Sequence, residues 1–473
     1  MNDAASALRQ TDEAELHDLV CVGFGPASLA IAVALHDAIE ASGADGLSSL
    51  GGRPPKVAFL EKQPRFAWHS GMLLEGAKMQ ITFLKDMATM RNPRSKFTFI
   101  NYLHSNQRLV EFMNMDTFLP ARIEYEDYMR WCANHFEDVV NYDSEVLSVV
   151  PEKTTVDSIA IDSFVIKSRN NATGDVSTRR ARNVVIATGG RPNIPAVFPQ
   201  QHPRVLHSSQ YATVARKIMS NRDAPYKVAV IGGGQSAAEI FNDIQEHYPN
   251  SQTKLLIRGP HLRPSDDSPF VNEVFNPSRV DDVFSRDPSV RSSSLLADKA
   301  TNYGVVRLTL LEKLYEGMYL QKLKYGPNSE AQWPHRILPH RNVASVTDSP
   351  VLENGLRLRV QNKSGEYFAA KAETEELLDV DLVLVASGYR RDAHEDILAG
   401  CRWLMPGGEQ EGRKWEVRRD YGVQLEEGKV SPGTGIWLQG CNEMTHGLSD
   451  TLLSILAVRG AELVGSIFAE EGN

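Results

Sequence analysis

The chain has 473 residues, of which 42% are hydrophobic and 23% charged, and its formal net charge is −9. This length predicts two or three domains, the acidic balance argues against a nucleic-acid partner, and no apolar run is long enough to span a bilayer. The four cysteines are scattered without a C-x-x-C pair, which disfavours metal sites and redox dithiols and fits a reducing cytoplasm. Residues 1–17 are polar and acidic, so we expect a disordered lead-in rather than a signal peptide.

The first organised stretch, Leu19–Leu29, predicts a strand, a glycine turn and the start of a helix. Gly23 permits a tight turn, Gly25 lets the backbone approach a pyrophosphate, and Pro26 suits the first turn of a helix. The N-terminus of that helix offers free N–H groups to phosphate. Ser28 takes the place of the usual third glycine, yet the flanking strand and helix favour a dinucleotide-binding fold.

A second strand is predicted over 57–60, and Glu61 stands at its end. In a dinucleotide fold an acidic residue at this place accepts hydrogen bonds from the adenosine ribose. Glu61 lies farther from Gly25 than the usual spacing, and a Gly/Ser/Pro-rich loop over 43–55 accounts for the excess. The alternative is a solvated carboxylate at a strand end.

Residues 64–104 are polar, aromatic and basic together and keep no helical or strand period, so they line a site or form an irregular cap. A strand that ends in Ala-Thr-Gly, as at 187–189, is typical of backbone that passes close to a bound flavin. Between these two stretches we predict an amphipathic helix over 125–136 and strands over 144–149, 164–166 and 184–186.

The strand–turn–helix pattern begins again with a strand over 227–231 and a complete G-x-G-x-x-A turn over 232–237. After the next strand, over 254–257, Arg258 stands where an acidic residue would favour NAD. A guanidinium there can pair with a 2′-phosphate, and His261 and Arg263 add positive charge, so we expect NADPH rather than NADH. The alternative is an arginine that pairs with a surface carboxylate.

Two dinucleotide folds in one chain indicate that the first holds FAD and the second NADPH. Strands over 381–389 and 436–440 end near a cofactor, and residues 446–450 lead into a helix over 451–468 whose N-terminus could face the flavin. We therefore predict an α/β protein with two Rossmann-like domains, in which the NADPH domain is inserted into a discontinuous FAD domain. The expected parts are 18–212 (FAD, first part), 213–389 (NADPH, with a small Ser/Asp/Asn/Pro-rich substrate-binding insertion around 265–306) and 390–473 (FAD, second part).

From Leu19 to about Leu463 the chain resembles the flavin-dependent N-hydroxylating monooxygenases, most closely the L-ornithine N-monooxygenases of siderophore biosynthesis, in a fungal-like form. The discriminating matches are the block over 78–104 and HGLSDTLLS over 446–454. Ser387 departs from the more usual Ala-Thr-Gly-Tyr string. The further matches are GFGPASLA (23–30), GGGQSAAE (232–239), NEVFNP (272–277) and ASGY (386–389).

The resemblance implies three sets of binding residues and no metal. FAD would be held by Gly23, Gly25, Pro26, Glu61, Lys62, Trp68, His69, Gln80, Val146, His446, Gly447 and Leu448. NADPH would be held by Gly233, Gly234, Gln235, Ser236, Arg258 and Asn302. The amino-acid substrate would be held by Lys85, Asn272, Glu273, Val274, Phe275, Asn302 and Ser449, with Lys85 on its α-carboxylate.

The resemblance also implies a reaction. NADPH reduces FAD, O2 gives a C4a-hydroperoxyflavin, NADP+ is retained, and the δ-amine of L-ornithine becomes N-hydroxyornithine. The amine must lose its proton first, because an alkyl amine has a pKa of about 10.4 in water. The flavin carries the chemistry, so no protein group is assigned as catalytic.

Alternatives remain at this stage. They are an L-lysine N-hydroxylase, another class B flavin monooxygenase that acts on ketones, a dithiol reductase, for which a cysteine pair is missing, and a non-catalytic dinucleotide sensor. We expect a cytoplasmic homo-oligomer, with a tetramer favoured.

Overall fold

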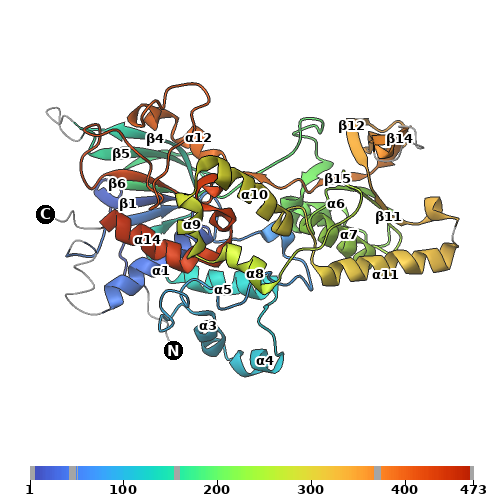
Figure 1. Cartoon of the computed structure of the whole chain (residues 1–473), viewed down its shortest axis with the longest axis horizontal. Helices are drawn as coiled ribbons and strands as arrows, with labels where there is room; N and C mark the ends of the chain where they lie inside the picture. The colour runs from blue at the N-terminus through green and yellow to red at the C-terminus, as the bar shows by residue number, and fades with distance from the viewer. Residues whose placement is uncertain are drawn as a thin grey trace.

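A computed structural model describes residues 6–41, 50, 52–153, 160–326, 328–366 and 374–468. Most of the loop expected over 43–55, and the first five and last five residues of the chain, lie outside the described residues. The described part forms two sheet domains with a helical segment between them (Figure 1).

The first sheet is built around β1 (Leu16–Val22), an apolar strand that is buried on both faces. Parallel strands give the order β3-β2-β1-β6-β17, and β5 and β4 extend the sheet from β6 as an antiparallel meander. The strands are β2 (Val57–Leu60), β3 (Val140–Asn141), β4 (Ser144–Glu152), β5 (Ser163–Asn170), β6 (Val176–Ile186) and β17 (Gly435–Leu438).

Helices α1 (Pro26–Glu40) and α14 (Leu456–Phe468) lie side by side against this sheet (Figure 1). They approach closely at Gly460, where an added Cβ atom would lie 2.7 Å from the carbonyl oxygen of Ala30. Three more helices follow in this domain: α5 (Arg122–Asn134) packs on α1, α3 (Phe99–Ser105) on α5, and α4 (Leu109–Asn114) on α3.

The second sheet is fully parallel, in the order β11-β10-β9-β15-β8. Helices α7 (Gln235–His247) and α11 (Leu308–Tyr325) cover one face, and an antiparallel sheet of β12, β13 and β14 packs on the other. The strands are β8 (Val205–His207), β9 (Lys227–Ile231), β10 (Gln252–Leu256), β11 (His335–Leu338), β12 (Arg341–Asp348), β13 (Leu356–Asn362), β14 (Thr374–Val380) and β15 (Leu382–Val385), with short helices α6 (Arg216–Ile218) and α12 (Ala393–Ile397) elsewhere.

The chain crosses between the two sheet domains twice, and the two crossings pair with each other. Strands β7 (Arg191–Pro192) and β16 (Tyr389–Arg390) form a two-residue antiparallel ladder. β16 spans the expected return at 390, and β8, which precedes the expected entry at 213, pairs with β15 of the second sheet. The domain bounds themselves stay predictions.

The segment around 265–306 forms three helices, α8 (Pro269–Asn272), α9 (Arg279–Ser285) and α10 (Pro288–Asn302), and lies between the two domains (Figure 1). It is attached to the C-terminal part of the chain through a small apolar cluster of Phe275, Leu295 and Leu448.

Two expected elements differ from the structure. The lead-in over 1–17 is ordered from residue 6, because Leu8 is buried in the first core and β1 begins at Leu16. The last helix begins at Leu456 rather than 451. After α13 (Glu443–His446) the chain makes two 3₁₀ turns, Leu448–Thr451 and Leu453–Ile455, that are separated by the extended Leu452.

Truncation of Leu8 tests whether the lead-in contributes to the core. Leu8→Ala should lower the free energy of unfolding by about 2–4 kcal/mol, because it removes a buried side chain and leaves a cavity. Leu323→Ala, on the exposed face of α11, is the control and should change it by less than about 0.5 kcal/mol. Urea denaturation of both variants measures this, and equal stabilities would contradict the placement of Leu8.

Candidate active site

The first glycine turn is closed by a backbone contact. Gly23 has φ +93°, and an added Cβ atom would lie 2.6 Å from the carbonyl oxygen of Ala187, so only glycine fits. Above Gly25, by contrast, no atom lies within 4 Å of a built Cβ. The first turn of α1, which begins at Pro26, therefore leaves open space at a positive helix end, as a bound pyrophosphate requires.

Glu61 fastens this turn from the end of β2. Its carboxylate accepts from the N–H groups of Phe24 at 2.8 Å and Gln63 at 2.9 Å, and the side chain is buried. The alternative of a solvated carboxylate is therefore wrong. Beside it, β4 starts with a 2.7 Å hydrogen bond from Ser144 to the Glu61 carbonyl, which brings Val146 near the turn, whereas Lys62 points to solvent.

Trp68 and His69 lie between the two folds. Their ring centroids are 4.9 Å apart, and the backbone of His69 is left-handed, with φ 48°. The His69 ring contacts Tyr389 of β16 at 5.9 Å, and Tyr389 contacts His207 of β8 at 4.9 Å. The segment that contains the exposed Gln80 follows. Aromatic groups from both folds thus meet beside the crossover.

The second glycine turn repeats the first. Gly232 has φ +140°, and an added Cβ atom would lie 2.5 Å from the carbonyl oxygen of Ala386. A cavity of about 730 Å³ opens over this turn. Five of the six residues expected to hold NADPH line it, namely Gly233, Gly234, Gln235, Ser236 and Arg258. The sixth, Asn302, does not line it, although Tyr303 and Gly304 do.

Positive charge gathers in the same cavity. Arg258 is exposed, and no carboxylate of the described residues lies within ion-pair distance of it, which removes the support for a surface ion pair. His261 and Arg263 also line the cavity. Sequence reasoning missed Arg341 at the start of β12, which lines the cavity and pairs with Glu376 at 2.7 Å. Arg341 belongs to no sequence motif and lies far along the chain from the glycine turn over 232–237, so the sequence alone does not connect the two.

Lys85 is half-buried without a counter-ion among the described residues. Burial lowers the pKa of its ammonium group. The neighbouring Asp86 is buried and engaged, since it accepts from the N–H groups of Thr89 at 2.6 Å and Phe99 at 2.7 Å. Tyr125 holds the backbone by donating to the Lys85 carbonyl at 2.9 Å. The ammonium group is therefore available for a ligand anion.

Arg307 joins the segment of Lys85 to the helical insertion. Its guanidinium donates to the carbonyl of Met79 at 2.9 Å and lies 3.5 Å from the carboxylate of Asp267. The Asp267 carbonyl in turn accepts from the amide of Asn272 at 2.9 Å. Two of the predicted substrate residues, Lys85 and Asn272, thus come from segments held by one arginine.

The remaining substrate residues surround the turn after α13. The turn Glu273–Phe275 packs against Leu448–Thr451, which contains the buried Ser449. Next to Asn302, the hydroxyl of Tyr303 donates to Glu443 at 2.6 Å and lies 3.0 Å from Thr451. Glu273 is engaged with Arg279 at 2.8 Å.

His446 is a packed framework residue. It stacks on Tyr421 at 4.3 Å, one ring nitrogen contacts the Thr445 hydroxyl at 2.9 Å and the other the Arg419 carbonyl at 3.1 Å. Burial lowers the pKa of His446 to about 4. The next residue, Gly447, has φ +92°.

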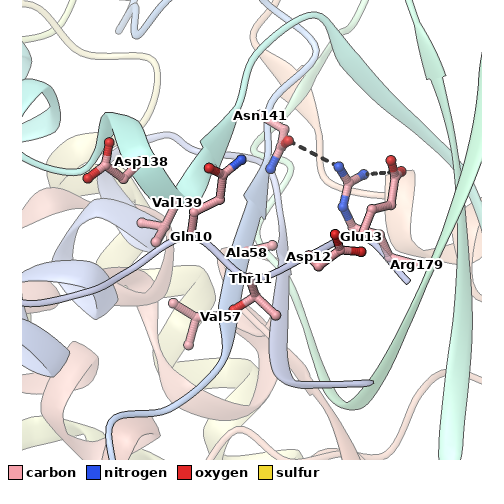
Figure 2. Close-up of a pocket in the computed structure, with 10 residues that line it drawn as sticks. All are labelled: Gln10, Thr11, Asp12, Glu13, Val57, Ala58, Asp138, Val139, Asn141 and Arg179. Carbon is pink, nitrogen blue, oxygen red and sulfur yellow. Dashed lines mark hydrogen bonds and ion pairs between the residues drawn. The ribbon is translucent and has the colours of Figure 1, made fainter. Parts of the chain in front are cut away.

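A separate polar cleft of about 640 Å³ lies at the N-terminal ends of β2 and β3 (Figure 2). Its one cation, Arg179, pairs with Glu13 at 3.1 Å and donates to Asn141 at 3.0 Å. This edge is opposite to the glycine turns, so the cleft is not part of the dinucleotide sites. Within the described ranges, no group of three His, Cys, Asp or Glu side chains could hold a metal ion.

Gly232→Ala tests the second turn. Backbone strain of about 1–3 kcal/mol, in addition to the clash with Ala386, should weaken NADP+ binding about tenfold or more while bound FAD is kept. Gly174→Ala is the control, because its φ is +83° but open space surrounds it. Fluorescence titration with NADP+ and flavin absorbance measure both effects, and unchanged NADP+ affinity in Gly232→Ala would contradict the assignment.

The chain is similar to known proteins over most of its length. A family described as L-lysine 6-monooxygenase/L-ornithine 5-monooxygenase matches residues 15–391. A protein of Cochliobolus heterostrophus named L-ornithine N(5)-monooxygenase is 61% identical over 98% of this chain and 88% of its own. The solved ornithine hydroxylase of Pseudomonas aeruginosa has a TM-score of 0.83 and 36% identity, over 96% of this chain and 99% of its own.

A further solved relative is the ornithine N-hydroxylase of Kutzneria sp. 744, in a structure titled with reduced FAD, NADP+ and L-ornithine. It is 33% identical with a TM-score of 0.83, over 96% of this chain and 99% of its own. These matches extend over both glycine turns and the helical insertion. The chain belongs to the L-lysine 6-monooxygenase/L-ornithine 5-monooxygenase family of flavin-dependent enzymes.

Proposed function

We propose that the protein hydroxylates the δ-amine of L-ornithine with NADPH and O2, and so supplies N-hydroxyornithine for a hydroxamate siderophore. The observation that carries the proposal is Lys85, a half-buried ammonium group without a counter-ion among the described residues, on a segment that Arg307 joins to the helical insertion. The names of the ornithine-hydroxylating relatives support the choice of substrate.

The residues present fit both cofactors. Open space over Gly25 and the charged cavity over Gly233 suit two dinucleotides. Bound FAD would supply the activation of oxygen, and NADPH the hydride. We further propose that the cavity over the second glycine turn retains NADP+ during the oxygen chemistry, with Arg258 on its 2′-phosphate.

The chain's own task is to place an amino acid and keep water out. Lys85 would bind the α-carboxylate, Asn272 and Asn302 the α-groups, and Ser449 would lie near the side-chain amine. The apolar cluster of Phe275 and Leu448 beside Ser449 disfavours a charged ammonium group, which helps the amine lose its proton. A lysine substrate, longer by one methylene, would shift the reacting amine and remains the alternative.

Lys85→Met tests the carboxylate role. Loss of a charge-assisted contact of about 1.5–3 kcal/mol should raise the KM for L-ornithine about 10- to 100-fold, while NADPH oxidation continues. Lys217→Met, on the exposed side of α6, is the control and should leave KM unchanged. Assays of hydroxylated amine with L-ornithine and L-lysine side by side measure this. An unchanged KM in Lys85→Met would overturn the role.

Arg258→Ala tests the preference for NADPH. Removing the guanidinium should weaken NADPH about 10-fold or more and leave NADH unaffected, because only NADPH carries the 2′-phosphate. Arg222→Ala, exposed in the same domain but outside the cavity, should change neither. Equal losses with both coenzymes would remove the 2′-phosphate assignment.

We also propose a homotetramer in the cytoplasm. A face of α11 exposes Leu308, Tyr315, Tyr319 and Leu323, each more than half accessible, and a second exposed apolar surface contains Val110, Met113, Met115, Phe118 and Ile123. Such patches mark interaction sites, and a tetramer with dihedral symmetry needs two kinds of interface. Cys21, Cys132, Cys401 and Cys441 are all free thiols, as in a reducing compartment.

No helix among the described residues has the length and apolarity to cross a membrane.

The double variant Tyr319→Glu/Leu323→Glu tests the α11 face. Charges on an apolar interface should reduce the tetramer to dimers, as should Met113→Glu/Phe118→Glu on the second surface, and all four changes together should give monomers. Mass photometry measures the masses. A wild-type monomer, or a tetramer that survives all four changes, would contradict the proposal.

A further inference from the structure

An ion pair with little solvent exposure joins the two folds close to the cavity over the second glycine turn. Arg122, the first residue of α5 in the first domain, donates from both of its terminal nitrogens to the two carboxylate oxygens of Glu239 on α7, each at 2.9 Å. It also donates to the carbonyl of Met72 at 3.0 Å. The two side chains are only 12% and 9% exposed. A bidentate pair with this burial fixes both distance and orientation between the domains.

The same pair holds Gln235, one of the residues that line the cavity. The Gln235 amide donates to Glu239 at 2.9 Å, and its oxygen accepts from the backbone N–H of Arg307 at 2.9 Å. Arg307 then donates to the Met79 carbonyl at 2.9 Å, back in the first domain. Arg122, Glu239, Gln235 and Arg307 form one connected set, which we call the Gln235 network.

The network settles which way the Gln235 amide faces. Its oxygen is used by a backbone donor, and one of its two N–H groups is used by a carboxylate, so one N–H group remains for a ligand. Without the guanidinium, Glu239 would be a buried carboxylate without a cation. Such a carboxylate is costly to keep buried, so it would move toward solvent and leave the Gln235 amide without its acceptor.

We propose that Arg122 is a positioning residue, which acts through Glu239 on Gln235 to seat NADP+ against the first fold. The inference rests on the proposed function and deepens it. Neither Arg122 nor Glu239 lines the cavity, so the effect is indirect. If NADP+ is bound less tightly, it should dissociate before the amine is hydroxylated. More of the consumed O2 should then leave as hydrogen peroxide.

The test separates positioning from stability by replacing the whole pair. Arg122→Met alone should lower Tm, because it leaves Glu239 buried and unpaired, and Arg122→Met/Glu239→Met should recover most of that loss, since apolar replacements of buried pairs are tolerated. We expect the double variant to bind NADP+ at least about tenfold more weakly and to give more peroxide per NADPH oxidised, despite its recovered Tm. NADP+ affinity and coupling that return to wild type together with Tm would overturn the proposal.

The pair of Arg91 and Asp37 is the matched control. Its side chains are 15% and 7% exposed, and both lie in the first domain. Arg91→Met/Asp37→Leu should leave NADP+ affinity unchanged; a tenfold loss there would show that any buried pair acts this way and would overturn a specific role for Arg122.

A second comparison does not depend on removing the pair. Arg122→Lys keeps the charge but loses the bidentate geometry, and Gln235→Leu removes the group that is positioned. If Arg122 acts through Gln235, Arg122→Lys should cause no further loss of NADP+ affinity in a protein that already carries Gln235→Leu. Fully additive losses in the double variant would refute the proposal that Arg122 acts through Gln235. NADP+ is titrated without amino acid, so a wild type that binds NADP+ but does not hydroxylate ornithine would contradict the proposed function and leave this inference standing.

Discussion

Both folds depend on one backbone contact. The first glycine of each turn lies against the carbonyl at the end of a parallel strand, Gly23 against Ala187 and Gly232 against Ala386, with no room for a side chain. The contact places the N-terminus of the following helix against the sheet. The N–H groups of the first helical turn stay free for a ligand. Each of these strand ends also leads directly into a crossover strand, β7 or β16. The same packing therefore fixes both the glycine turns, where the cofactors would bind, and the path of the chain between the domains.

The groups that would recognise substrate come from elsewhere. Lys85 stands on an irregular segment, Asn272 and Asn302 at the C-terminal ends of helices α8 and α10, and Ser449 in a 3₁₀ turn. None belongs to a sheet, so their placement depends on contacts such as that of Arg307 with Met79 and Asp267. A rigid pair of sheets thus carries an adaptable substrate region, which is the usual division between scaffold and function.

The parts that are local in sequence were predictable. Buried parallel strands followed by glycine turns have a short signature, and the strands over 227–231 and 254–257 and the helix over 125–136 lie where the pattern placed them, to within a few residues. Arg258 could be predicted near the second turn because it directly follows the strand over 254–257, and it lines the cavity there. Glu61 proved to be buried because it bonds the backbone of the turn, a contact that strand-end position alone does not reveal.

The rest depended on contacts between distant segments. β8 has too short an apolar run to be assigned to a sheet before its partner β15 is known. Leu8 lies in a polar stretch, and only its burial in the first core orders it. Arg341 and Arg122 carry no motif, since their roles come from partners more than thirty residues away. The two turns before α14 replaced a helix start because Leu452 is extended.

The ladder between β7 and β16 has a consequence for the history of the chain. Everything between Asn193 and Gly388 leaves and returns at one point, so the ends of this segment lie side by side. A domain whose two ends lie side by side can be inserted into another domain, or replaced, without separating the strands of the domain that receives it. The second glycine turn and the helical insertion with Asn272 and Asn302 both lie inside this segment, so one exchange would carry the coenzyme turn and this part of the proposed substrate site together.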